Sequence, residues 1–130
     1  MNRGSFDALL ETLNVLRERS QDAPIIVEGP RDERALREIG VTGPIYQVQT
    51  ASSVFEFCES LALKHREALL FTDLDSAGKK IGRTVKKYLT DKGVKIDNNL
   101  AKKLLYALDT VETEKVAVRL ERVCRKFSYP

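Results

Sequence analysis

Short apolar runs alternate along this sequence with longer segments of helical periodicity, and this alternation most narrows the folds open to the chain. The runs are too short for helices and are rich in β-branched residues, which indicates buried strands at residues 25–27, 45–48, 68–71 and 94–96. Because a helical segment follows each run and returns the chain, the order predicts a mostly parallel sheet of about four strands with helices on both faces. We therefore expect an α/β fold.

The helical segments have apolar residues three or four positions apart. They cover residues 5–20, 31–39, 54–62 and 77–89, and two more helices follow within residues 98–128. A length of 130 residues without internal repeats is usual for one domain. We expect a single domain over residues 1–130, with a core motif region at 23–97, a helical N-terminal extension at 5–20 and a helical tail at 98–128.

The composition excludes some classes of protein. No segment approaches the roughly 20 apolar residues of a membrane-spanning helix, and the first residues lack the apolar run of a signal peptide. Cys58 and Cys124 lie far apart in helical patterns, which is typical of reduced thiols inside cells. We expect a cytoplasmic protein without membrane contact, and the net charge of +3 is compatible with a polyanionic partner.

Acidic residues follow the first and the third predicted strands. Glu28 comes directly after the first strand, and Asp73 and Asp75 come shortly after the third. In an open parallel sheet the ligand crevice lies beyond the carboxyl ends of the strands where the strand order reverses, normally between these two strands. Period-two spacing directs Asp73 and Asp75 to the same side of an extended segment. We therefore expect the three carboxylates to converge in one crevice.

Crowded carboxylates favour a hard divalent cation, because like charges otherwise raise one another's proton affinity. Oxygen ligands without His or Cys nearby suit Mg²⁺ or Mn²⁺, and magnesium keeps waters and phosphate oxygens among its ligands. We expect Glu28, Asp73 and Asp75 to be both the metal ligands and the catalytic residues, with Glu28 passing protons. The implied chemistry is phosphodiester cleavage or transfer.

Glycines and basic residues surround these acids in the sequence. The expected phosphate or nucleic-acid contacts are Gly29, Arg31, Gly78, Lys79, Lys80 and Arg83. Asp32 fits a supporting acid at the metal, and it equally fits a cap for the first turn of its helix. Each acidic motif alone is common, and acidic residues often only cap helices, so a structural role for the cluster stays open.

Two motifs in this order resemble the Toprim domain. They are IIVEGPRD at residues 25–32 and LLFTDLDSAGKKI at residues 69–81. Type IA topoisomerases, bacterial primases and several nucleases share this domain, and the resemblance is greatest to small stand-alone Toprim proteins and to the maturase of 5S ribosomal RNA. It covers about residues 23–97 and implies that Glu28 is the general acid or base and that Asp73 and Asp75 bind magnesium.

The resemblance implies a magnesium-dependent protein that acts on nucleic-acid phosphodiesters, and among such activities we favour a nuclease of RNA or DNA. A non-catalytic nucleic-acid-binding or adaptor module on the same scaffold is the alternative. The chain departs from topoisomerases, which have a further acidic residue where Ser76 and Ala77 stand. A receiver-type signalling domain also clusters aspartates at strand ends, but its lysine on a later strand is not evident.

The tail is rich in basic residues, and we expect most of them to form an ordinary solvated helix face. A nucleic-acid face is the less favoured interpretation. A protein partner or a second copy of the chain, bound through the helical tail, also remains open.

Overall fold

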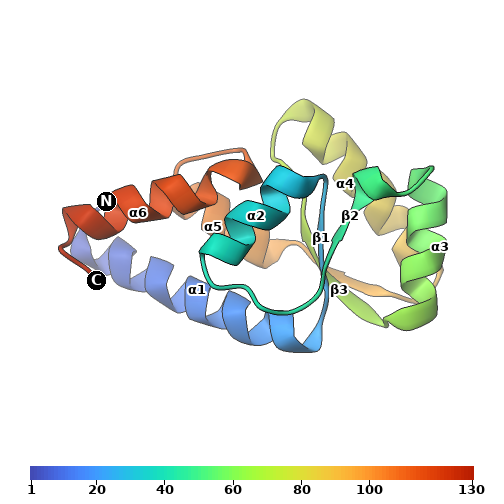
Figure 1. The fold of residues 1–130 in the computed structure, drawn as a ribbon, viewed down its shortest axis with the longest axis horizontal. Coiled ribbons are helices and arrows are strands. Elements are labelled where there is room, and N and C mark those ends of the chain that lie inside the picture. The colour runs from blue at the N-terminus through green and yellow to red at the C-terminus, as the bar shows by residue number, and fades with distance from the viewer.

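A single parallel sheet of four strands runs through the computed structural model, which describes residues 1–130 (Figure 1). The strands are β1 (Ile25–Val27), β2 (Ile45–Gln47), β3 (Glu67–Phe71) and β4 (Lys95–Asp97). Their order is β2-β1-β3-β4, so the direction in which strands are added reverses between β1 and β3. The predicted α/β fold is confirmed, and the reversal lies where a ligand crevice is expected.

Six α-helices accompany the sheet and cover both of its faces (Figure 1). They are α1 (Arg3–Asp22), α2 (Pro30–Glu38), α3 (Val54–Lys64), α4 (Ser76–Asp91), α5 (Asn99–Ala107) and α6 (Val116–Lys126), with short 3-10 turns at η1 (Val48–Thr50) and η2 (Thr113–Lys115). Each predicted helix is present with shifted bounds. None of the helices combines the length and the apolar character that crossing a membrane requires.

Alternate strand residues contribute to two separate hydrophobic layers. Ile25 and Val27 of β1 pack with α1, α2, α5 and α6, whereas Ile26 between them packs with α3 and α4. In β3, Phe71 belongs to the first layer and Leu70 to the second. Because successive strand residues face opposite sides, short runs that are wholly apolar are expected where helices cover both faces of a sheet.

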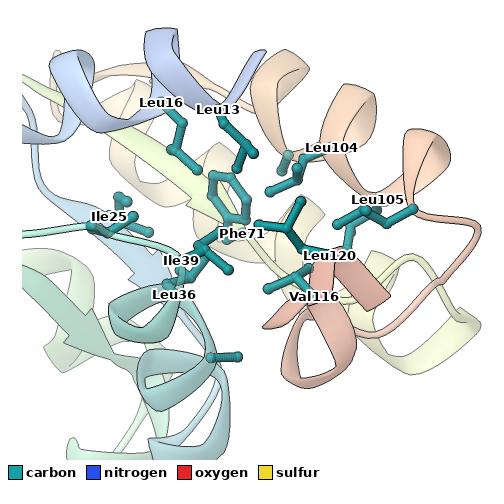
Figure 2. Packing of buried hydrophobic residues seen from close by; sticks show 14 of the residues in the cluster. Leu13, Leu16, Ile25, Leu36, Ile39, Phe71, Leu104, Leu105, Val116 and Leu120 are labelled. Carbon is teal, nitrogen blue, oxygen red and sulfur yellow. The ribbon is translucent and has the colours of Figure 1, made fainter. Parts of the chain in front are cut away.

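The first of these layers joins both ends of the chain to the sheet. Phe71 lies among side chains from the terminal helices and from α2 (Figure 2), which include Leu13, Leu16, Leu36, Leu104, Leu105, Val116 and Leu120. Phe6 of α1 stacks on Phe127 with 4.4 Å between the ring centroids. Burial of apolar surface contributes about 25 cal/mol per Å² to the free energy of folding. The helical tail therefore stabilises the folded core.

Helix starts differ from the predictions where an unpredicted residue caps them. The side chain of Asn2 accepts a hydrogen bond from the N–H of Ser5 at 2.8 Å, so α1 begins at Arg3. α4 begins at Ser76 because Asp75 caps it. The second of these differences bears directly on the acidic site.

Candidate metal and phosphate site

Glu28 follows β1, and its carboxylate reaches the segment that follows β3. Oε2 of Glu28 accepts a hydrogen bond from the backbone N–H of Asp73 at 2.8 Å. Val27 and Phe71 are paired residues at the ends of the two strands, so the chain leaves both strands at the same edge of the sheet. The two predicted site residues are neighbours because β1 and β3 are adjacent and parallel.

Asp73 is held by a loop that sequence analysis did not connect with the site. Its Oδ1 accepts a hydrogen bond from the N–H of Thr113 at 2.9 Å, and Thr113 Oγ1 donates to the carbonyl of Phe71 at 3.4 Å. The N–H of Leu74 donates to the carbonyl of Val111 at 2.8 Å. Thr113 is fully buried, but no sequence motif marks it, because these contacts arise only when α5 packs against β3 and when η2 and α6 pack against α2.

Asp75 has a different local role from Asp73. It is the N-cap of α4, and its Oδ1 accepts a hydrogen bond from the N–H of Gly78 at 2.7 Å. β3 ends at Phe71, so strand geometry does not set the directions of the two aspartates, and their convergence on one side stays a prediction. No group of three or more Asp, Glu, His or Cys side chains is already arranged to hold a metal ion, but Asp75 acts electrostatically on both Glu28 and Asp73.

Burial raises the pKa of Glu28 and of Asp73 above their ordinary values. The N–H groups of Asp73 and Thr113, which donate to these two carboxylates, act in the opposite direction. Neighbouring carboxylates raise both pKa values further, and Asp75 contributes to each. A nearby cation would therefore stabilise the charged form of this pair.

The donor set fits a magnesium ion that is held by few protein ligands. One oxygen of each of the three carboxylates accepts a backbone N–H, and all the donors are oxygens. Magnesium usually takes one or two protein carboxylates and fills its other positions with waters and phosphate oxygens. Glu28 and Asp73 are the pair that would hold it, with the exposed Asp75 beside them.

Asp32 caps α2. Its Oδ2 accepts a hydrogen bond from the N–H of Gly29 at 3.1 Å, and the residue is buried. Burial raises the pKa of Asp32, and the N–H of Gly29 opposes this shift. Of the two roles expected for Asp32, the structure shows the capping contact, and a role as a supporting acid stays a prediction.

The two glycines of the motifs allow close packing around the acids. A Cβ atom at Gly78 would lie 2.2 Å from the carbonyl oxygen of Asp73, and one at Gly29 would lie 2.6 Å from Oε1 of Gln49. The N–H of Gln49 in turn donates to the carbonyl of Glu28 at 3.0 Å. Gly78 is needed because its neighbour is backbone, whereas the end of the Gln49 side chain could move away from a Cβ at Gly29. The predicted contact of both glycines with phosphate stays a prediction.

A basic hollow with a volume of about 300 Å³ lies beside Asp73. Of the predicted phosphate ligands, Lys79 and Arg83 line it, and Lys86 and Lys102 join them without having been predicted. The other two predicted basic residues, Arg31 and Lys80, are not part of its lining. Nη1 of Arg31 instead lies 4.0 Å from Oε2 of Glu114.

The acids stand at the switch point of a parallel α/β sheet, next to a basic hollow, which places the chain in the class of open α/β proteins whose ligand crevice lies beyond the carboxyl ends of the strands. The family model of the Toprim domain matches residues 23–104, and the chain belongs to this family. Toprim domains generally bind Mg²⁺, and membership indicates a metal-dependent function related to nucleic acids.

Within the family, the chain is similar to small archaeal proteins named UPF0292. It is 32% identical to one from Pyrococcus abyssi over 76% of this chain and 70% of that protein. It is 28% identical to one from Methanocaldococcus jannaschii over 73% of this chain and 74% of that protein. A solved structure of an Aquifex aeolicus protein matches with a TM-score of 0.71 and 25% identity, over 82% of this chain and 96% of that one. The predicted resemblance to small stand-alone Toprim proteins is confirmed.

Proposed function

We propose that this protein is a magnesium-dependent nuclease that cleaves RNA or DNA phosphodiesters at the Glu28–Asp73 pair. The observation that carries the proposal is the 2.8 Å hydrogen bond that joins the two motifs, from the N–H of Asp73 to Glu28. The basic hollow lined by Lys79 and Arg83 supports it, because a nuclease must bind phosphates beside its metal ligands.

The residues of the site have separate parts in the proposed reaction. Lys79 and Arg83 bind backbone phosphates and orient the scissile bond. Glu28, whose pKa burial raises, is suited to take a proton from water or give one to the departing oxygen. Asp73 would hold the magnesium ion together with Glu28, with the exposed Asp75 beside them. The bound ion would supply positive charge for the negative charge that develops on the phosphate oxygens.

Amide substitutions test this proposal with little structural disturbance. Asp73→Asn keeps an oxygen that can accept the N–H of Thr113, and Glu28→Gln keeps one for the N–H of Asp73. Each variant should lower magnesium-stimulated cleavage roughly 100-fold or more, because it removes a charge or a proton-transfer group. The measurement is cleavage of labelled single-stranded and structured RNA and DNA during a magnesium titration, with the melting temperature recorded in parallel.

Glu11→Gln is the matched control, because Glu11 is an exposed carboxylate on α1 outside the site. It should cleave at the wild-type rate. Magnesium should raise the melting temperature of the wild type and of Glu11→Gln but not that of the two site variants. Cleavage at the wild-type rate by a folded Asp73→Asn protein would remove the nuclease proposal.

A nucleic-acid-binding module without turnover is the second candidate. It is favoured by the basic hollow, whose lysines and arginine would bind backbone phosphates with or without a metal ion at the acids. Salt-dependent binding of RNA or DNA, with no cleavage under Mg²⁺ or Mn²⁺, would select this candidate over the nuclease. For either function we propose a cytoplasmic location, where reducing conditions keep Cys58 and Cys124 as free thiols.

A further inference from the structure

The helical tail has a second basic surface, formed by two adjacent hollows along α5 and α6. Both hollows are lined by Tyr106, Asp109 and Arg119. The other charged side chains of the two linings are Glu112, Lys115, Arg122 and Lys126. The two linings together contain four basic and two acidic side chains, so the net charge of this surface is positive.

This surface neighbours the basic hollow beside Asp73. Lys102 lines the hollow at Asp73 and Tyr106 lines the hollows of the tail, and the two residues lie one helical turn apart on the same face of α5. Leu74 lines the hollow beside Asp73, and Val111 lines one of the two tail hollows. The 2.8 Å hydrogen bond from the N–H of Leu74 to the carbonyl of Val111 therefore joins the walls of these two hollows. A polyanion that follows α5 would remain in contact with basic side chains from the tail to the acidic site.

Tyr106 stands where the two tail hollows meet, and 67% of its surface is exposed. No other aromatic ring of the chain stacks against it. An exposed ring beside a guanidinium such as that of Arg119 offers a nucleobase a stacking surface and its phosphate a bidentate donor. A duplex keeps its bases stacked on one another, so this combination favours a single strand.

We propose that the α5–α6 face binds single-stranded nucleic acid, with a base stacked on Tyr106 and backbone phosphates bound by Arg119 and Lys102. This inference rests on the proposed function, because it names single strands as the substrate class of the same site. The sequence led us to expect that most basic residues of the tail form an ordinary solvated helix face. The proposal instead gives this face a role in binding nucleic acid.

Fluorescence anisotropy with labelled oligo(dT) and oligo(U) of about 15 nucleotides tests the proposal. EDTA is present throughout, so metal-dependent cleavage does not interfere. Tyr106→Ala should raise the Kd about ten-fold, because it removes one stacking platform. Tyr106→Phe, which keeps the ring, should bind at least about five-fold more tightly than Tyr106→Ala.

Arg119→Gln tests the phosphate contact separately. It should weaken binding and lower the slope of log Kd against log salt concentration by about 0.7, the value for one phosphate contact on a single strand. Lys64→Gln is the control, because Lys64 is exposed on α3 in the opposite layer and its replacement removes the same charge. It should leave both the Kd and the slope unchanged. Melting temperatures check that each variant is folded.

The outcomes separate this inference from the nuclease proposal. Single-strand binding that depends on Tyr106, without cleavage in magnesium, upholds the inference and removes the nuclease. Cleavage with unchanged binding by Tyr106→Ala and Arg119→Gln overturns the inference alone. Equal affinity for a hairpin duplex also overturns it, and so does an absence of oligonucleotide binding by the wild type, which would assign the face to an acidic protein partner.

Discussion

Each acidic side chain of the site accepts a hydrogen bond from one backbone N–H group. Glu28 accepts the N–H of Asp73, Asp73 accepts that of Thr113, and Asp75 accepts that of Gly78. Such hydrogen bonds favour the charged carboxylate, whereas burial disfavours it at Glu28 and Asp73. Asp75 differs from the other two acids because it is exposed and serves as the N-cap of α4.

At the residue scale, Gly78→Ala should be strongly destabilising. The added Cβ would lie 2.2 Å from the carbonyl oxygen of Asp73, so either α4 or the Asp73 segment must move. We expect a loss of roughly 3 kcal/mol in the free energy of unfolding, at the upper end for overpacking. Urea denaturation followed by circular dichroism measures it.

Gly4→Ala provides the matched control in α1. Its Cβ would meet Oδ1 of Asn2 at 3.5 Å, an ordinary contact distance. Since alanine is a better helix former than glycine, this variant should be about 0.5 kcal/mol more stable than the wild type. If Gly78→Ala proved as stable as Gly4→Ala, the close packing of α4 on Asp73 would be incorrect.

At the scale of elements, η2 and α6 connect the tail to the acidic site. η2 supplies the N–H of Thr113 to Asp73, and it packs against α2. α6 follows it directly and buries Val116 and Leu120 in the core around Phe71 (Figure 2). Packing of α6 therefore fixes the loop that holds Asp73.

Val116→Ala tests the contribution of α6. Val116 is fully buried, and removing its methyl groups should cost roughly 2 kcal/mol of unfolding free energy through lost burial and a small cavity. Val118→Ala on the same helix is the control, because Val118 is 50% exposed and should change stability by less than about 0.5 kcal/mol. Thermal or urea unfolding measures both. Equal losses in the two variants would contradict the observed orientation of α6.

At the scale of the whole molecule, one hydrophobic cluster extends from Phe6 to Leu120. It includes residues of α1, the sheet, α2, α5 and α6, so the two ends of the chain share a core with the motif region. The second cluster lies on the other face of the same strands. Neither the N-terminal helix nor the tail has a core of its own.

The chain should therefore unfold in one cooperative transition. Far-ultraviolet circular dichroism reports the helices, and tyrosine fluorescence reports in part on Tyr106 within the tail and on Tyr129 just after it. The two signals should give coincident urea curves with one midpoint, as two-state unfolding requires. An earlier transition in fluorescence alone would show that the tail unfolds separately and would contradict the shared core.

The sequence by itself determined the order of elements, the parallel sheet and the meeting of Glu28 with Asp73. These follow from local apolar periodicity and from the rule that adjacent parallel strands end at the same edge. The two motifs also sufficed for the Toprim family. The position of Lys79 and Arg83 beside Asp73 was predictable, because they stand on the first turns of the helix that follows it.

Only the tertiary structure shows which groups hydrogen-bond to the acids and which residues of the tail join the site. The partnership of Thr113 with Asp73 and the place of Lys102 in the basic hollow depend on how α5 and α6 pack on the sheet. Local periodicity shows that such helices are amphipathic, but many orientations would bury the same apolar stripe. Their position is chosen by the complementary shapes of side chains far apart in sequence, which is information that no local pattern contains.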